Sequence, residues 1–536
     1  MGLRPPVPAT PHRARMSSRS RSVPSKQGST MASSLTTASP SPAHEKTVLG
    51  HPIGLATLFM TEMWERFSYY GMRALLVLYL VSGGVDAATG SQGGGLGFTA
   101  ATATAIYSVY VAMVYLMAMP GGWFGDRVWG ARKTVAIASF VIMAGHVALA
   151  VPGQLAFFVG LLLVAVGSGL LKANISTMVG HLYKDADDPR RDSGFTIFYI
   201  GINVGAFAAP IAIGTIGETI NWHLGFFLAA VGMGVGLVIF LLAGRTLSPK
   251  SSVVPNPLSP AERKAVITKA LAVLAVVAVF YGAVVAADMF TIKWALYPIT
   301  IAGLIIPVAV LTRIKRDKDL TPGEQTRMSA YIWFFVAAAV FWMIYDQGGS
   351  TLSLFGDKSS ERSLFGWEVP TTIFQSLNPL FVVALAPVFA AAWVALARRN
   401  REPSTIVKFS VALIIVGASF FVFAIPLSQT AGNDTKVTMW WLVLIFLMHT
   451  LAELCLSPVG LSVTTKMAPQ KYGSQMMGVW FLAVTAGDCI TGLLGLAEVQ
   501  LNGVGVILFQ AFAAVLAGVA IFMYRKKVNA LMGGMN

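Results

Sequence analysis

The chain has 536 residues, of which 55% are hydrophobic and 12% charged, and its mean hydropathy is +0.68. Soluble domains carry about 25% charged residues, so this composition excludes a soluble globular protein, and the long apolar runs exclude a membrane β-barrel, whose strands alternate. The net charge of +15 does not indicate nucleic-acid binding, because the basic residues lie in short segments between apolar runs, as membrane topology requires.

The first 48 residues are rich in serine, proline and arginine, as in RARMSSRSRSVPSK. They contain no apolar segment of the kind that a signal peptide needs. Because low hydrophobicity with high charge is typical of disorder, we expect residues 1–48 to form a disordered tail.

Fourteen apolar runs follow, each long enough to cross a bilayer at roughly 20 residues per crossing. The expected spans are 53–81, 100–120, 133–151, 155–177, 194–213, 223–244, 264–287, 292–312, 328–350, 371–397, 405–426, 437–463, 474–497 and 503–524. They predict an N-terminal six-helix bundle (49–246), a linker with an extra helix pair (247–326), a C-terminal six-helix bundle (327–527) and a tail (528–536). We therefore expect an all-α polytopic membrane protein with the major facilitator fold, which is built from two such halves. The extra pair carries few charges, so we expect it to lie outside the transport bundle.

Charged loops orient these spans. Basic residues gather in every second loop: Arg127, Arg132, Lys133, Lys184, Arg190, Arg191, Arg245, Lys250, Arg313, Lys315, Arg316, Lys318, Arg398, Arg399, Arg401, Lys466, Lys471 and Arg525 to Lys527. The opposite loops offer little more than Lys293, Lys358, Arg362 and Lys436. By the positive-inside rule, both termini are expected in the cytoplasm.

A glycine-rich basic loop follows the second span, GGWFGDRVWGARK at residues 121–133. It resembles the loop motif of the major facilitator superfamily, in which glycines allow a tight turn and Asp126 and Arg127 would pair helices. Its position after the second span strengthens the prediction of that fold.

The first span contains TEMWERFSYYGMR at residues 61–73. Each charge at the bilayer centre costs roughly 2.5–3.5 kcal/mol, and this helix carries four. Helical spacing places Glu62, Arg66, Tyr69 and Arg73 on one face, with Glu65 and Tyr70 beside it. A structural ion pair would account for one glutamate and one arginine but not for two of each. We therefore expect the stripe to face a water-filled path, the usual setting of intramembrane charges.

Further charges lie inside other spans. Lys172 in the fourth span needs a nearby carboxylate to remain charged, and Glu62 and Glu65 are the candidates. Asp346, at the end of the seventh span, is expected to pair with Arg73, which lies at the same depth.

Glu453, in HTLAELCLSPVG, lies in the C-terminal half with Ser457 one turn away. Local hydrogen bonding to a neighbouring helix is the alternative explanation for this glutamate. Together with Arg66, Arg73 and Lys172 in the other half, it would suit a ligand that bears both a carboxylate and an ammonium group. The cations would face the carboxylate of such a ligand.

Three motifs in order resemble the proton-coupled oligopeptide transporters. The E-x-x-E-R-F-x-Y-Y-G motif is complete at residues 62–71, and F-Y-x-x-I-N-x-G is complete at 198–205. The fourth-span motif is GSGLLKANIST at 167–177, with Ala173 where proline is usual. The resemblance covers nearly the whole chain after residue 50, including the extra helix pair of bacterial members, and so implies a bacterial inner membrane.

The resemblance implies proton-driven import of di- and tripeptides, with protons as the coupling ion and no other cofactor. It assigns proton coupling to Glu62, Glu65, Arg66 and Lys172, and the gate would be Arg73 with Asp346. Residues implied to hold the peptide amino terminus are Asn203, Asn378 and Glu453. The implied pocket aromatics are Tyr69, Tyr70, Tyr115, Tyr199, Trp342 and Trp480.

Two positions depart from the family pattern. Animal members carry a histidine after A-I-Y in the second span, where this chain has Ser108, so coupling through that histidine is not available. Ala173 would soften a bend near Lys172 without removing the charge.

Other functions were weighed against peptide transport. Nitrate, which plant relatives carry, has no ammonium group for Glu453 to bind. A peptide-sensing receptor would need a soluble signalling domain, and the sequence shows none. An enzyme would need a nucleophile–base set or a metal cluster; His146 and His449 are isolated and there is no H-E-x-x-H pattern, so no metal is expected.

Overall fold

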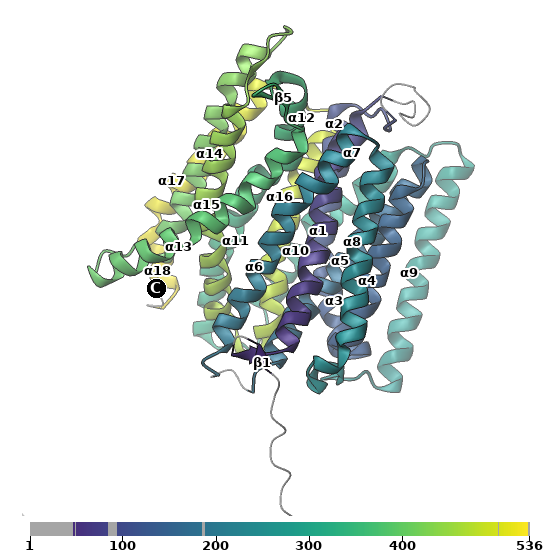
Figure 1. Cartoon of the computed structure of the whole chain (residues 1–536). Helices are drawn as coiled ribbons and strands as arrows, with labels where there is room; N and C mark the ends of the chain where they lie inside the picture. The colour runs from purple at the N-terminus through teal and green to yellow at the C-terminus, as the bar shows by residue number, and fades with distance from the viewer. Residues whose placement is uncertain (1–46, 49, 84–93, 185–187, 502, 534–536) are drawn as a thin grey trace, which may run out of the picture. The chain divides into compact units, whose positions relative to one another are not determined.

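The computed structural model describes residues 47–48, 50–83, 94–184, 188–501 and 503–533. These residues form long helices that lie side by side (Figure 1), with short strands at their ends. The tail predicted for residues 1–48 lies outside the described residues, apart from Thr47–Val48, which form β1.

The N-terminal bundle contains six long helical segments, several of which are interrupted by short turns of tighter or wider helix. Its elements are α1 (Gly54–Val81), α2 (Ala100–Leu116), α3 (Ala118–Phe124), η2 (Gly125–Trp129), α4 (Ala131–Ala150), α5 (Gln154–His181), α6 (Arg191–Ala209), η3 (Pro210–Gly214), α7 (Thr215–Thr219), α8 (Trp222–Leu242), η4 (Ala243–Thr246) and η5 (Pro249–Ser252). Strands β1 and β2 (His51–Pro52) pair antiparallel just before α1.

The rest of the chain supplies the linker helices and the C-terminal bundle. The linker helices are α9 (Pro260–Ala286) and α10 (Ile292–Lys315). The bundle consists of α11 (Pro322–Tyr345), η6 (Asp346–Gly349), α12 (Thr351–Ser359), η7 (Thr371–Ser376), α13 (Leu377–Arg398), α14 (Thr405–Thr430), α15 (Trp440–Met467), η8 (Gln470–Tyr472), α16 (Gly473–Leu496), α17 (Val504–Met523) and α18 (Arg525–Leu531). Strand β3 (Ser360–Glu361) pairs parallel with β6 (Val437–Thr438), and β4 (Ser363–Leu364) pairs antiparallel with β5 (Trp367–Glu368).

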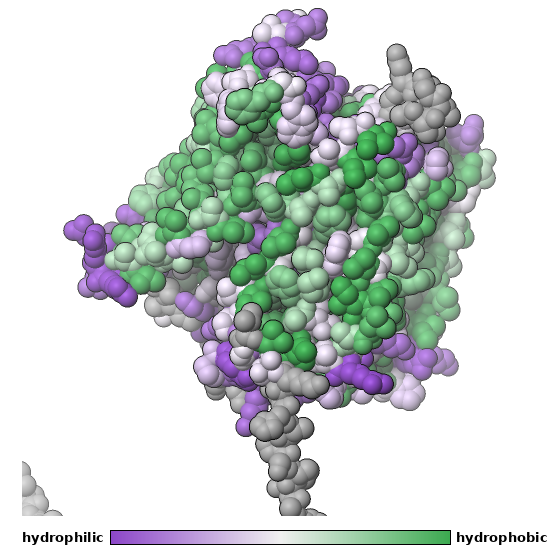
Figure 2. Space-filling view, viewed as in Figure 1, coloured by the Kyte–Doolittle hydropathy of each residue, from purple (hydrophilic) through white to green (hydrophobic). Residues whose placement is uncertain are grey.

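Thirteen segments of the described chain are long and apolar enough to cross a membrane. Helix α1 is long enough to span a membrane, at 28 residues, but its charged residues exclude it from this set, which is limited to apolar segments. With α1 included, the all-α fold with fourteen spanning helices predicted from the sequence is confirmed. Figure 2 shows apolar residues over the sides of the helices and polar residues gathered at the two ends.

Local sequence signals define where several helices begin. Helices α9 and α11 start with the same arrangement, a capping residue followed by proline and, at the third helical position, glutamate. In each, the Ser259 or Thr321 hydroxyl accepts a hydrogen bond from the glutamate backbone while the glutamate carboxylate accepts one from the capping backbone. This reciprocal capping satisfies donors that a helix start leaves unpaired.

Each half has its own hydrophobic core. One is formed almost entirely by residues 55–247 and the other by residues 311–532. The second core includes Val528, which is fully buried on α18. The segment predicted as a tail from residue 528 therefore begins as a packed helix.

The linker pair is unequal. Helix α9 is almost wholly exposed, with only Val284 buried, which agrees with the prediction that it lies outside the bundles. Helix α10 instead packs against α16 and α2, where Gly303 lies against the Cys489 side chain. It therefore covers the outside of the seam between the two halves.

The loops that carry Arg127, Lys184, Arg190 and Lys250 meet at one end of the helices, which we call the basic end. Hydrogen bonds there join Lys184 with Lys250, Gly50 with Arg190, Asp126 with Asn256, and Arg127 with Leu258. Helix α9 leaves this end and α10 returns to it, where Asp317 binds Lys471 of the C-terminal bundle at 2.7 Å. At the opposite end, which we call the far end, Lys293 pairs with Glu498 at 2.6 Å. For these loops, the excess of basic residues on one side that the sequence predicts is present in the structure.

Candidate functional site

A buried cluster of charges occupies the middle of α1. Arg66 Nε lies 2.7 Å from Glu62 Oε1 and 2.9 Å from Glu65 Oε2, and all three side chains are almost completely buried. Ser168 of α5 donates a hydrogen bond of 3.2 Å to the other oxygen of Glu65. Two carboxylates therefore share one guanidinium, so the cluster is one positive charge short unless it binds a proton.

Motif glycines bring neighbouring helices close to this cluster. A side chain at Gly205 of α6 would collide with the backbone carbonyl of Met63 and touch the Arg66 side chain, and one at Gly71 would collide with Ile213. Both glycines belong to the motifs recognised in the sequence. They are needed because α6 and η3 pack directly on the charged stretch of α1.

Lys172 does not occupy the predicted position. It makes no ion pair within 4.0 Å of any described carboxylate, because Arg66 already contacts both Glu62 and Glu65. Its Nζ instead lies 3.7 Å from the centre of the Tyr115 ring and 5.8 Å from that of Phe481. A direct ion pair with the glutamates is therefore not formed in this conformation, although both glutamates act on Lys172 electrostatically, and its ammonium contacts aromatic faces. Helix α5 runs through Ala173 without interruption.

Tyrosines continue the polar stripe along α1. Tyr69 and Tyr70 contact each other edge to face, and the guanidinium carbons of Arg66 and Arg73 lie 5.7 and 6.0 Å from their respective ring centres. Tyr70 is also within electrostatic range of Glu453 of the other bundle. The stripe therefore faces the seam between the halves.

The predicted pairing of Arg73 with Asp346 is confirmed. Arg73 Nη2 donates to Asp346 Oδ1 at 2.6 Å, and Nε donates to the hydroxyl of Tyr107. A side chain at Gly349 would collide with that same hydroxyl. The pair joins α1 to η6 and thus links the two bundles.

Glu453 is held by neutral donors. Its Oε2 accepts hydrogen bonds from the Tyr345 hydroxyl at 2.6 Å and from Asn378 Nδ2 at 2.9 Å, and Asn378 also donates to Thr450. No cationic side chain among the described residues lies within 4.0 Å of this carboxylate. The hydrogen bonding weighed as an alternative is present, yet the negative charge remains uncompensated.

The other pocket residues predicted in the C-terminal half lie at different depths. Trp342 packs edge to face on Tyr345, and its indole nitrogen and the Ser457 hydroxyl are buried without a hydrogen-bond partner. Trp480, however, is 3% exposed and packs against Phe409 and Gly460 inside the C-terminal core. In this conformation Trp480 is a core residue, because the absence of a side chain at Gly460 admits its ring.

The predicted α6 residues face the seam. Asn203 is buried and donates to the carbonyl of Tyr199 at 3.0 Å, whereas the Tyr199 side chain is 47% exposed. Tyr199 is within electrostatic range of Glu453 and Tyr70. Asn203 makes no hydrogen bond to Glu453 here, so its predicted contact with a ligand remains a prediction.

Glu218, at the end of α7, was not expected from the sequence. Its carboxylate accepts hydrogen bonds from the backbone of Thr371 at 2.7 Å and of Thr372 at 2.9 Å, and it pairs with Arg362 at 3.2 Å. It therefore caps η7 of the opposite bundle, where the free N–H groups of a helix start favour an anion. We call Glu218, Arg362, Thr371 and Thr372 the far-end latch.

Polar links between the bundles are confined to one side. In the described chain they involve Arg73–Asp346, the far-end latch, Ser376 with Phe207, Gln375 with Ala74, and Thr485 with Ala112. Each of these links lies at the far end or in the middle of the helices, whereas nearer the basic end Met119 of α3 lies against Gly478 of α16. The polar links that join the halves in the described chain are thus concentrated toward the far end.

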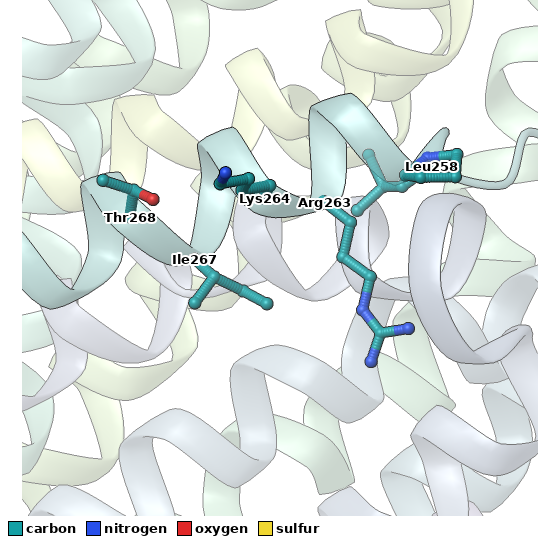
Figure 3. A pocket seen from close by; sticks show the side chains of 6 residues that line it. Leu258, Arg263, Lys264, Ile267 and Thr268 are labelled. Atoms are coloured by element: carbon teal, nitrogen blue, oxygen red, sulfur yellow. The ribbon is translucent and has the colours of Figure 1, made fainter.

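One surface pocket is unrelated to these residues. It has a volume of about 390 Å³ and lies at the start of α9, where Arg263, Lys264 and Ile267 line it (Figure 3). All of its lining residues lie between 258 and 268, and none contacts the charged cluster or Glu453. The candidate site is therefore the seam between the bundles.

Comparison with known proteins identifies the family. Residues 132–500, more than half of the chain, match the sequence profile of the POT family.

The chain belongs to the POT family.

Two curated relatives show how far the similarity to POT proteins extends. The chain is 44% identical over 493 residues to the uncharacterized transporter YclF of Bacillus subtilis, covering 89% of this chain and 97% of the relative. It is 39% identical over 496 residues to a di-/tripeptide transporter of Lactococcus lactis subsp. cremoris, covering 91% and 98%.

Solved POT structures share the fold. A crystal structure of peptide transporter POT in complex with sulfate superposes with a TM-score of 0.84 at 41% identity, covering 91% of this chain and 97% of that one. A POT family transporter in complex with 5-aminolevulinic acid gives a TM-score of 0.84 at 34% identity, covering 90% and 98%. The similarity therefore includes both bundles.

Proposed function

We propose that the chain is a proton-coupled symporter that imports di- and tripeptides by alternating access. The observation that carries the proposal is the charge arrangement at the seam: arginines on α1 and, across from them, a glutamate without a cationic partner. A peptide zwitterion fits this arrangement, because its ammonium would compensate Glu453 and its carboxylate would bind Lys172, or Arg66 and Arg73 once protonation of a neighbouring carboxylate frees them. The Lactococcus relative is a di-/tripeptide transporter, which supports peptides as the substrate class.

The same arrangement argues against the alternatives. Nitrate would leave Glu453 as a partly buried, uncompensated charge, which is costly inside a membrane. A receptor without transport is disfavoured because the relatives that the chain covers almost completely are named as transporters. Protons would be the only coupling ion, bound at the Glu62–Glu65–Arg66 cluster.

The direct test is uptake of labelled dialanine into proteoliposomes. Uptake is expected to exceed equilibration only when the outside is acidic relative to the inside. A proton ionophore serves as the control and should reduce uptake to the equilibrium level. Uptake that is insensitive to the proton gradient would contradict symport, and absence of any dialanine uptake would contradict peptide transport.

Charge distribution supports an orientation. By the positive-inside rule, the basic end would face the cytoplasm of a bacterial cell and the far end the outside. The conformation would then be inward-facing. Arg73–Asp346 would form the outer gate, and the far-end latch would form a second contact between the bundles, nearer the outer surface.

Replacing Glu218 with alanine is expected to favour the outward-open state. The change removes acceptors for two backbone donors and for Arg362, and loss of such a buried charged partner costs about 2–5 kcal/mol. Spin labels on Ile220→Cys and Lys358→Cys, at the far ends of opposite bundles, should report a longer mean distance. Glu368→Ala is the matched control, because Glu368 contacts Arg362 at 3.3 Å from within the same bundle and is 75% exposed. Equal distances in the two variants would show that the latch does not hold the bundles.

A further inference from the structure

A second acidic side chain lies at the outer gate. Asp488, near the outer third of α16, is 1% exposed, and its Oδ2 is buried without a hydrogen-bond partner. Neither of its oxygens forms a hydrogen bond or ion pair with any described residue. An intramembrane carboxylate in this condition indicates a functional site.

The neighbours of Asp488 on α16 show what it faces. A side chain at Gly487 would touch the α11 backbone near Met343, and Thr491 donates to the Met343 carbonyl. Gly492 lies against Val109 of α2. Asp488 therefore projects into the seam between α2 and α11, where the bundles meet.

The charged and titratable groups around Asp488 are few. Arg73 of α1, Asp346 of η6, Tyr107 of α2 and the thiol of the adjacent Cys489 lie within electrostatic range. On α10, which packs against the same helix, Gly303 lies against the thiol of Cys489.

Groups on the remaining neighbouring elements are already engaged elsewhere. Glu453 of α15 and Tyr345 of α11 are hydrogen-bonded to each other. Lys172 lies beside Tyr115; it is within electrostatic range of Asp346, but it is not among the groups that act on Asp488. Arg73 is thus the cation that remains near Asp488.

Counting charges at the closed gate leaves Asp488 without compensation. Arg73 donates to Asp346 and to Tyr107, and Asp346 also has one buried oxygen without a partner. With both carboxylates ionised, closure would bury an unpaired negative charge beside another one, which is strongly unfavourable. A proton on one of the two carboxyl groups removes that cost.

We propose that Asp488 is a proton-binding site of the outer gate, which takes up a proton from the outside before Arg73 and Asp346 can close. Opening would separate Arg73, on the N-terminal bundle, from Asp346 and Asp488, which both move with the C-terminal bundle. Both carboxyl groups then meet external water, where Asp488 releases its proton. The inference rests on the proposed alternating-access function, and it adds a group that makes gate closure depend on external pH.

The test measures the gate without any substrate. Protein labelled at Ile220→Cys and Lys358→Cys is placed in nanodiscs, and the fraction with a short far-end distance is followed from acid to alkaline pH. This closed fraction should fall with rising pH in the otherwise unmodified protein, because one coupled proton changes the closing equilibrium by up to about tenfold per pH unit.

Asp488→Asn, which mimics the protonated group, should stay closed at alkaline pH. Glu498→Gln, an exposed carboxylate on the loop after the same helix, should behave like the unmodified protein.

Parallel pH curves for Asp488→Asn and the unmodified protein would overturn the proposal. If Asp488→Asn does not fold, infrared difference spectroscopy on the unmodified chain gives an independent answer. A protonated carboxyl band that changes frequency in Asp488→Glu would support the proposal, and the absence of such a band would overturn it. Because no peptide is present, these results do not depend on dialanine uptake, which tests the proposed function separately.

Discussion

Replacing Glu453 with alanine is expected to abolish most dipeptide transport. Glu453 is the acceptor for an ammonium group in the proposed site, and its existing partners, Tyr345 and Asn378, are neutral donors. A peptide ammonium that leaves water without a carboxylate partner should lose about 2–5 kcal/mol of binding free energy. The measurement is dialanine counterflow in proteoliposomes with peptide on both sides, so that proton coupling does not limit the rate.

Two controls separate charge recognition from structural damage. Tyr345→Phe removes one hydrogen bond to Glu453 but keeps the carboxylate, so it should reduce counterflow much less. N-acetyl-dialanine has no ammonium group, so its transport should be poor even in the unmodified protein and should fall proportionally less in Glu453→Ala. Equal losses for the capped and free peptides would mean that Glu453 does not bind the amino terminus and that the peptide lies in the reverse orientation.

Replacing Glu65 with glutamine should abolish proton-driven uptake while counterflow largely survives. Glu65 and Glu62 contact the same nitrogen of Arg66, so the two carboxylates compete for one guanidinium. A glutamine fixes the neutral form at one position, and the cluster then has one carboxylate for one guanidinium and no need of a proton. The measurement compares dialanine uptake driven by an inward proton gradient with dialanine counterflow in the same proteoliposomes.

Ser168→Ala is the matched control for this prediction. It removes the 3.2 Å hydrogen bond to Glu65 but leaves a carboxylate that can titrate, so uptake should still follow the proton gradient. Rates of proton-driven uptake in Glu65→Gln equal to those of the unmodified protein would remove this glutamate from the coupling mechanism.

The parts of the site that follow from a single helix were predictable from sequence. Helical spacing alone places Glu62, Arg66 and Arg73 on one face, and the structure has that face at the seam. The pairing of Arg73 with Asp346 was also predictable, because the two charges were expected at the same depth of two spanning helices.

Contacts that depend on how helices pack were not predictable in the same way. Lys172 was expected beside the glutamates, but the packing of α5 and α2 places it over the Tyr115 ring. Trp480 reaches the C-terminal core only because Gly460 leaves room for it. No local pattern in the sequence reports such a fit.

The sequence marks two residues of the outer gate as functional to different degrees. Glu218 lies at the end of the short helix α7, near a chain reversal where a glutamate ordinarily faces solvent, so nothing marked it as a cap for η7, which begins at Thr371. Asp488 did carry a signal, since it interrupts an apolar span in TAGDCI. The argument that singled out Glu453 applies equally to it.

The far-end latch has a consequence for the kinetics of the transport cycle. In the proposed orientation, Glu218 and Arg73–Asp346 hold the empty protein closed on its outer side, so a turnover that starts without substrate must break these contacts before a new peptide can enter. Internal peptide offers another route outward, because the loaded protein exchanges its cargo and never passes through the empty return. Net accumulation should consequently be slower than exchange, and peptide preloaded inside vesicles should accelerate entry from outside. The contacts at the far end would thus make the return of the empty transporter, rather than the movement of the peptide, the step that limits the rate of net peptide uptake.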